Sequence, residues 1–364
     1  MIISNLINFL ELHFPISLQE SYDNCGLLLG DDTVEIKGVL ISLDVTEKVV
    51  EEAIEKNCNV IISHHPIIFK GIKNLSKKNY TNRVLIKCIQ NNIALYAIHT
   101  NLDNHINGVN SKIAEKINLI NTKILQHKKD ALLKLVVYMP TNKLEVLDNA
   151  IFESGGGKIG NYSECHFRNA GIGTFTPNEK ANPTLGKKLI REQVDEFRVE
   201  YLVPIHSKEA VYNAMIGAHP YEEVAHEWIS IQNLNQDIGS GIIGDLVEEI
   251  SVENFLNQIK ETFQCGIIKF SNSTKNNIKK VAVCGGSGSF LITEAKSQKA
   301  DVYITSDVKY HDFFEGENQL IIADIGHYES EQFTGELIAE KLKENFSNFA
   351  IHLTEINTNP INYL

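Results

Sequence analysis

The chain has 364 residues, which is more than one ordinary hydrophobic core requires and predicts two or three domains. A composition of 43% hydrophobic and 22% charged residues is typical of a globular protein and excludes wholesale disorder or a fibrous repeat. The net charge of -12 opposes binding to a phosphate backbone, so we do not expect nucleic acid as a partner.

Neither a membrane nor an oxidising compartment is indicated. No run approaches about 18 apolar residues, and the first residues lack the positive region of a signal peptide. The six cysteines are scattered singly without a CxxC pair, so we expect reduced thiols in a cytoplasmic protein. A metal site would therefore have to use histidine and carboxylate ligands.

The first stretch alternates apolar strands with amphipathic helices, as in a parallel sheet. Thr46 is placed as the N-cap of the first of these helices. In chain order the prediction is a strand over 39–45, a helix over 47–57, a strand over 59–63, a helix near 83–91 and a strand over 94–98. The final third repeats this pattern with strands over 281–286, 301–306 and 319–325, followed by one long helix over 328–344.

The middle of the chain has a different order of predicted strands and helices. Its predicted elements are a strand over 133–140, a helix from 144, strands and turns across 169–186, a strand over 196–204, a helix over 207–216 and a strand over 224–231. This β-α-β-β-α-β order predicts a ferredoxin-like α+β domain over 130–235, inserted between the two halves, 1–129 and 236–364, of an α/β domain.

Histidine and carboxylate side chains follow three of the predicted strands. His64 and His65 follow the strand over 59–63, where ligands collect in open α/β sheets, although Pro66 also allows a simple strand-end turn. His99 and Asp103 follow the strand over 94–98. Asp103 could instead form a polar turn or a helix cap, and His99 could be a packed histidine or one that supports a ligand.

His327 and Glu331 follow the last predicted strand and stand four residues apart. If a helix begins near His327, both side chains lie on one face, where they can share a metal centre or form an exposed surface contact. We expect three strands to bring these groups to the same edge of one sheet. Five ligands suit two metal ions better than one; Zn²⁺ is favoured, and Mn²⁺, Fe²⁺ and Co²⁺ are compatible.

Three further segments have two interpretations each. CGGSGS, from Cys284, could cradle an anion or form a tight strand-to-helix turn. Asp307 and His311 could assist a metal ligand or carry a proton, or Asp307 could sit at a helix N-terminus. The turn from Tyr22 to Gly30 could contact a substrate or be an ordinary polar turn.

Taken in order, the motifs YDNCGLLLGD, SHHPIIF, AIHTNLD, GAHPYEEVAHE, CGGSGS, DVYITSDVKYHD and DIGHYESE resemble those of the NIF-three-like family of dinuclear-metal-centre proteins. Members of this family are often called GTP cyclohydrolase 1 type 2 homologues. The resemblance covers about residues 1–355. It departs at Ser306, where the family usually has glycine, and at Cys25, which occupies a variable place.

The resemblance implies an α/β metal domain with a PII-like insert, assembled as a ring-shaped homohexamer. It places the metal ligands on His64, His65, Asp103, His327 and Glu331. The cyclohydrolase name implies attack by a metal-activated water on a purine ring, with a proton relay that His99, Asp307 or His311 could provide.

Two functional hypotheses follow. The first is a metal-dependent hydrolase that acts on a nucleotide or another phosphate-containing small molecule. The alternative is a non-enzymatic metal-binding or regulatory assembly whose insert binds a small effector or partner protein.

Overall fold

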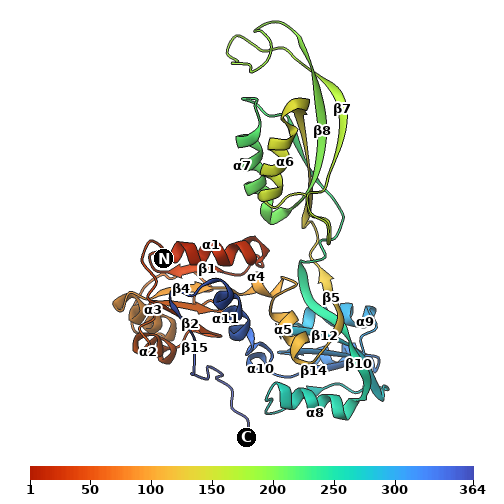
Figure 1. The fold of residues 1–364 in the computed structure, drawn as a ribbon. Helices are drawn as coiled ribbons and strands as arrows, with labels where there is room; N and C mark the ends of the chain where they lie inside the picture. Colours follow the sequence, from red (N-terminus) through yellow and green to blue (C-terminus); the bar gives the residue numbers. More distant parts are fainter. The chain divides into compact units, whose positions relative to one another are not determined.

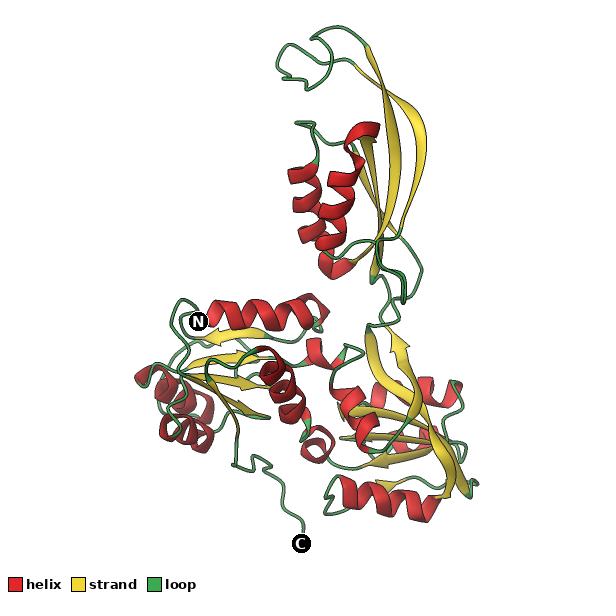
Figure 2. Ribbon diagram, in the orientation of Figure 1, coloured by secondary structure: helices red, strands yellow, loops and turns green.

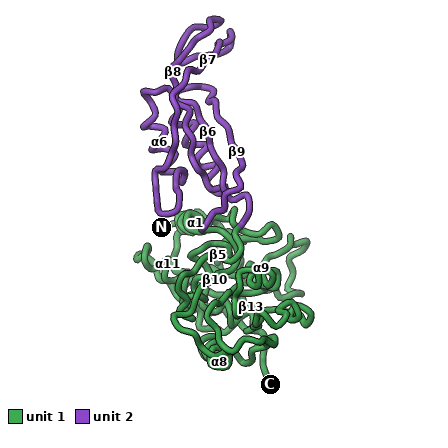
Figure 3. Tube along the Cα trace, turned by 90° about the vertical axis from the view of Figure 1, so that its right-hand side faces the viewer, with its two compact units in different colours: residues 1–127, 237–364 green, residues 128–236 purple.

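The computed structural model describes residues 1–364 and divides them into two compact units. The first unit consists of residues 1–127 and 237–364, and the second of residues 128–236 (Figure 3). The first unit is therefore built from two stretches that are separated in sequence. None of the helices has both the length and the apolar character needed to span a membrane.

The first unit has a mixed α/β fold with two sheets (Figure 1). The five-stranded sheet has the spatial order β1 (Gly26–Leu29), β4 (Ala94–Ala97), β3 (Val60–Ser63), β2 (Gly38–Ser42) and β15 (Ala350–Leu353). The six-stranded sheet has the order β11 (Lys269–Phe270), β14 (Ile321–Asp324), β13 (Val302–Ser306), β12 (Asn277–Ser287), β10 (Gly239–Ser251) and β5 (Ile120–His127).

Both sheets contain parallel strand pairs. Parallel pairing joins β4, β3, β2 and β15 in one sheet and β12, β13 and β14 in the other, while β1, β5, β10 and β11 form antiparallel pairs. The expectation of a single sheet carrying all the ligands is wrong. Because the two halves of the chain pair mainly within themselves, β3 and β4 belong to one sheet and β14 to the other.

Helices cover and connect these sheets. They are α1 (Ile3–His13), α2 (Glu47–Glu55), α3 (Tyr80–Gln90), α4 (Thr100–Asp103), α5 (Val109–Lys116), α8 (Val252–Thr262), α9 (Ile292–Ser297), α10 (His327–Glu331) and α11 (Thr334–Asn345), with short 3-10 turns η1 (Ile16–Leu18), η4 (Ser289–Leu291) and η5 (Asp312–Gly316). The predicted N-cap is confirmed, because Thr46 Oγ1 accepts a hydrogen bond from Val49 N at 3.1 Å. Helices α4, α5, α10 and α11 lie between the two sheets (Figure 1).

The alternating side chains of the central strands explain why this arrangement is stable. In β2, Val39 and Ile41 join the core that extends to β12, β13 and β14, whereas Leu40 packs on the other side with residues of α2 and α3. Side chains of a strand point alternately to its two faces, so a continuous apolar run fits a strand buried on both. All three residues are fully buried.

The long helix predicted over 328–344 is wrong in one respect, because the structure divides it into α10 and α11 at Gln332 and Phe333. Helix α10 packs against β12 and β13, whereas α11 packs against β15 and β2. The two segments therefore serve different sheets. Gln332 Nε2 donates to Phe263 O at 2.8 Å beside the break.

The second unit contains one antiparallel sheet with both helices on one face (Figure 2). Its elements in chain order are β6 (Leu132–Pro140), η2 (Thr141–Lys143), α6 (Leu144–Glu153), β7 (His166–Phe175), β8 (Glu192–Pro204), η3 (Ile205–Ser207), α7 (Lys208–Ala218) and β9 (His226–Ser230). The sheet order is β7-β8-β6-β9. Its core joins β6 and β8 residues such as Val137 and Val203 to Leu147 of α6 and Val211 of α7.

Candidate metal centre

Five side chains able to bind a metal converge in the first unit. His64 and His65 follow β3, Asp103 ends α4, and His327 and Glu331 are the first and last residues of α10. Since α10 is a single short helical segment, the four-residue spacing places His327 and Glu331 close together, at 3.1 Å between Nε2 and Oε2.

His64 and Asp103 form one side of the cluster. His64 Nε2 lies 3.6 Å from Asp103 Oδ1, and both atoms are buried without a hydrogen-bond partner. His64 Nδ1 donates to Ile98 O at 2.9 Å, which leaves the lone pair on Nε2. Two ligands of a tetrahedral ion stand roughly 3.4 Å apart, so this buried pair has a spacing that suits a shared metal. The donor set therefore fits a metal ion.

Glu331 connects this pair to the other imidazoles. Its Oε1 lies 3.8 Å from His64 Nε2, and its Oε2 lies 3.0 Å from His65 Nε2. His65 Nε2 and His327 Nε2 are 3.4 Å apart. These distances place the carboxylate between two groups of possible ligands, one facing each oxygen. Its residue is only 3% exposed.

The charge of Glu331 governs the protonation of the cluster in the absence of metal. Burial lowers the pKa of His65, but its hydrogen bonds to Asp44 and Glu331 outweigh burial and raise it to about 10. For His327, burial is likewise outweighed by Glu331 and Asp307, and the pKa rises to about 9. Protons on these two imidazoles thus balance the carboxylates when no metal is bound.

His64 and Asp103 respond differently because both are deeply buried. Burial lowers the pKa of His64 to about 4, although Glu331 opposes the shift, so His64 is a neutral imidazole at pH 7. Burial and the negative charge of Glu331 raise the pKa of Asp103. Burial would also raise the pKa of Glu331, but its contacts with His327, His64 and His65 hold it well below its usual value.

Three histidines at the centre each donate Nδ1 to an aspartate. The pairs are His65 with Asp44 at 2.8 Å, His327 with Asp307 at 2.6 Å, and His99 with Asp23 at 2.9 Å. A carboxylate on Nδ1 fixes the orientation of an imidazole and leaves Nε2 free to act as a ligand or base. The aspartates therefore determine which nitrogen each ring presents.

The three sequence candidates for a proton carrier are placed differently. One nitrogen from each of His64, His65 and His99 lies within 4.8 Å of the other two, so His99 is part of the cluster. Asp307 contacts His327 and also accepts from Ser287 Oγ at 2.7 Å. His311 is exposed, and its ring contacts are with Tyr310 and Phe314.

Glycines in β12 make room for Glu331. A Cβ on Gly286 would lie 2.3 Å from Glu331 Oε1, and the φ of Gly286 is +62°. The anion-cradle interpretation of CGGSGS is wrong for its first two glycines, because Gly285 N already donates to Asn110 Oδ1 and Gly286 N to Ser330 Oγ. The close approach of the Glu331 carboxylate explains Gly286, and packing against Val109 and Ile113 of α5 explains Gly285.

Sequence reasoning missed the aspartates that orient His65 and His99. Asp44 follows β2 at the same end of the sheet as the SHHP motif, but within VLISLDV it reads as part of a strand. Asp23 belongs to the turn from Tyr22 to Gly30, for which the sequence indicated either a substrate contact or an ordinary polar turn. Each aspartate pairs with a histidine that is distant in sequence, so the pairs cannot be read from the sequence alone. The one feature that could have indicated Asp44 is its position just beyond the end of a strand.

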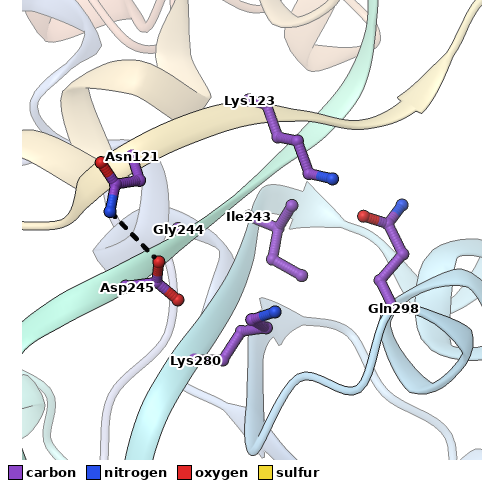
Figure 4. Close-up of a pocket in the computed structure, with 7 residues that line it drawn as sticks. All are labelled: Asn121, Lys123, Ile243, Gly244, Asp245, Lys280 and Gln298. Carbon is purple, nitrogen blue, oxygen red and sulfur yellow. Dashed lines mark hydrogen bonds between the residues drawn. The ribbon is translucent and has the colours of Figure 1, made fainter.

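A cavity of about 190 Å³ lies elsewhere in the first unit (Figure 4). It is lined by Asn121, Lys123, Ile243, Gly244, Asp245, Lys280 and Gln298. Asn121 Nδ2 donates to Asp245 Oδ2 at 3.4 Å on one side. None of the five ligand candidates lines this cavity, so it is separate from the histidine and carboxylate cluster.

The fold and this cluster define a mixed α/β protein with a possible metal site between two sheets. The family described as Duf34/NIF3 (NGG1p interacting factor 3) matches residues 1–360. The chain therefore belongs to this family, which confirms the resemblance seen in the motifs.

Curated relatives and solved structures agree with this assignment. The GTP cyclohydrolase 1 type 2 homolog of Staphylococcus epidermidis strain RP62A is 37% identical over 367 residues, with 100% of both chains covered. The homolog of the same name from Staphylococcus aureus strain MSSA476 is 36% identical over 369 residues, again with 100% of both covered. A Bacillus cereus protein related to NIF3 has a TM-score of 0.86 and 35% identity, with 100% of this chain and 99% of that chain covered.

Proposed function

We propose that the first unit binds two divalent metal ions through His64, His65, Asp103, His327 and Glu331. The observation that carries this proposal is the buried pair of His64 Nε2 and Asp103 Oδ1, which face one another without hydrogen-bond partners. Buried polar atoms are rarely left unsatisfied in folded proteins, and a cation shared by the two atoms would satisfy both. Zn²⁺ is favoured by the imidazole and carboxylate donors, with Mn²⁺, Fe²⁺ and Co²⁺ as alternatives.

We further propose that the metal centre makes the protein a hydrolase for a nucleotide or another phosphate-containing small molecule. Bound ions would supply an activated water and positive charge for an anionic substrate. His99 is the best-placed residue to move a proton, because Asp23 holds its Nδ1 and its ring lies 5.1 Å from that of His64. Asp307 would orient His327, and we propose no catalytic role for His311.

Metal analysis together with a broad activity screen tests this proposal. Protein purified without added metal should contain about two ions per chain. Metal-loaded protein should release phosphate or ammonia from at least one compound in a nucleotide and phosphate-ester panel. His64→Ala should keep about one ion per chain and lose turnover, whereas His99→Ala should keep both ions and lose turnover. His13→Ala, a histidine in α1 that bonds Phe9 O, is the control and should keep both properties.

The alternative is a non-enzymatic metal-binding or regulatory assembly. Its support is that residues 128–236 form a separate compact unit that supplies none of the five ligands, so this unit is available to bind a small effector or partner protein. Tight metal binding without turnover across the whole panel would favour this alternative over the hydrolase.

We also propose that the second unit is a ferredoxin-like, PII-like insert and that the protein assembles as a homohexamer. The β-α-β-β-α-β order and the β7-β8-β6-β9 sheet support the first statement, and the motif resemblance supports the second. Light scattering should give about six times the chain mass of 40.9 kDa. A single-chain mass at micromolar concentration would contradict the hexamer.

A further inference from the structure

The segment that follows β15, residues 354–364, runs as an irregular stretch to the C-terminus (Figure 1). Its side chains form hydrogen bonds with Asp44 and Glu329, which neighbour the proposed metal ligands. Hydrogen bonds within the segment stabilise its backbone conformation. Asn357 Oδ1 accepts from Asn359 N at 2.8 Å, and Asn359 Oδ1 accepts from Ile361 N at 3.0 Å. Such side-chain bonds to the backbone two residues on favour one turn geometry. The segment thus has a defined course past the site.

Its first contact is with the aspartate that orients His65. Thr358 Oγ1 donates to Asp44 Oδ2 at 2.8 Å, while Asp44 Oδ1 accepts from His65 Nδ1 at 2.8 Å. The terminal torsion of an aspartate is broad, so a carboxylate with only one partner is free to rotate. A hydroxyl on the second oxygen restrains the carboxylate plane and hence the direction of His65 Nε2.

Its second contact is with α10, which carries two of the proposed ligands. Asn359 Nδ2 donates to Glu329 Oε1 at 3.1 Å, and Tyr363 Oη donates to the same oxygen at 3.3 Å. Glu329 is only 5% exposed and lies between His327 and Glu331 in sequence. The Tyr363 ring is seated against the backbone of Gly266, where a Cβ would approach the ring to 2.4 Å.

We propose that residues 358–363 are a positioning element of the metal centre, in which Thr358 holds Asp44 and thereby His65, and Asn359 and Tyr363 hold Glu329 and thereby α10. The proposal rests on the proposed function, since it requires His65 and α10 to supply metal ligands. One segment would then restrain ligands from both sheets, because Asp44 follows β2 and α10 follows β14.

Stepwise Zn²⁺ binding to the full chain, measured by competition with a chromophoric chelator, tests this role. Thr358→Val removes the hydroxyl and keeps the shape, so it should weaken one binding step about tenfold. This should be the step that is lost in His65→Ala, with the other step unchanged. Asp44→Asn should weaken the same step, and Thr358→Ser should restore the wild-type affinity.

The chain offers a matched control four residues earlier. Thr354 Oγ1 also donates to a carboxylate, that of Glu52, which binds Lys56 and is not among the residues that contact the proposed ligands. Thr354→Val should therefore keep both Zn²⁺ affinities, even if urea unfolding shows a stability loss. The double variant Asn359→Ala, Tyr363→Phe should weaken both steps, because α10 carries His327 and Glu331.

Two results would overturn the positioning role. One is a Thr358→Val protein that binds both ions as tightly as wild type. The other is a Thr354→Val protein weakened as much as Thr358→Val, which would indicate a general loss of stability. Wild-type protein that binds no Zn²⁺ would instead refute the proposed metal centre itself, and the positioning role with it.

Discussion

Glu331 is the residue whose two oxygens face different groups of proposed ligands, Oε1 toward His64 and Oε2 toward His65 and His327. Glu331→Gln keeps the shape and removes the charge that offsets two cations, so it should weaken both metal sites. We expect clearly less than one ion per chain after dialysis, measured by elemental analysis of protein that remains folded by circular dichroism.

His65→Ala is the comparison for this prediction. It removes a ligand that faces only Oε2 of Glu331, and His64, Asp103 and Oε1 remain for the other ion. About one ion per chain should therefore be retained, because three protein ligands suffice for a typical zinc site. Two tightly held ions in Glu331→Gln would show that this carboxylate does not bridge.

Protonation of His65 and His327 makes metal binding depend on pH. Their pKa values of about 10 and about 9 without metal lie above neutral, so at pH 7 both imidazoles carry a proton that a metal ion must displace. Affinity should rise with pH, by about tenfold per unit for each displaced proton, until it levels off above the pKa values.

Titration calorimetry at pH 7 in two buffers of different ionisation enthalpy measures this proton release directly. His64 has a pKa of about 4 and should contribute no released proton at this pH. His65→Ala should release fewer protons than wild type. Metal binding at pH 7 without any proton release would contradict the protonated state of the metal-free cluster.

At the scale of elements, β12 and α10 fit together only because Gly286 has no side chain. Gly286→Ala would place a Cβ 2.3 Å from Glu331 Oε1 at a φ of +62°, where the left-handed backbone alone costs about 1–2 kcal/mol. We expect lower stability in urea and weaker metal binding at both sites, because Glu331 must move.

Gly71→Ala is a suitable control for this change. No atom lies within 4 Å of the added Cβ, and Gly71 is not among the glycines with positive φ. Its stability and metal content should match those of wild type. Equal behaviour of the two variants would show that the packing of β12 against α10 does not constrain Glu331.

On the scale of the whole molecule, residues 128–236 should be removable. The flanking residues His127 and Gly239 are register partners in the antiparallel pair of β5 and β10, so a short linker can close a hairpin between them. All five proposed ligands lie in the first unit. The deletion variant should fold and keep the metal content of the full chain, as judged by circular dichroism and elemental analysis.

Loss of metal from a folded deletion variant would make the second unit part of the site. The intact chain carrying His219→Ala is a useful companion, because His219 is a buried histidine of that unit that bonds Tyr138 O. Its metal content should be unchanged.

The sequence by itself determined much of the local structure and the candidate ligands. Apolar runs such as NVII predict strands because a strand buried on both faces needs apolar side chains throughout, and the motifs around His64, Asp103 and His327 are specific enough to indicate the family. Thr46 predicted its helix start because an N-cap is a local interaction.

Only the tertiary structure decided how the pieces combine. Nothing local distinguishes strands that share a sheet from strands in two sheets, so the expectation of one ligand edge was wrong for β14. The break between α10 and α11 follows from packing against two different sheets, which overrides a helical pattern that continues through both. The partners Asp44, Asp23 and Thr358 were likewise decided by the fold, because their hydrogen bonds join residues that are distant in sequence.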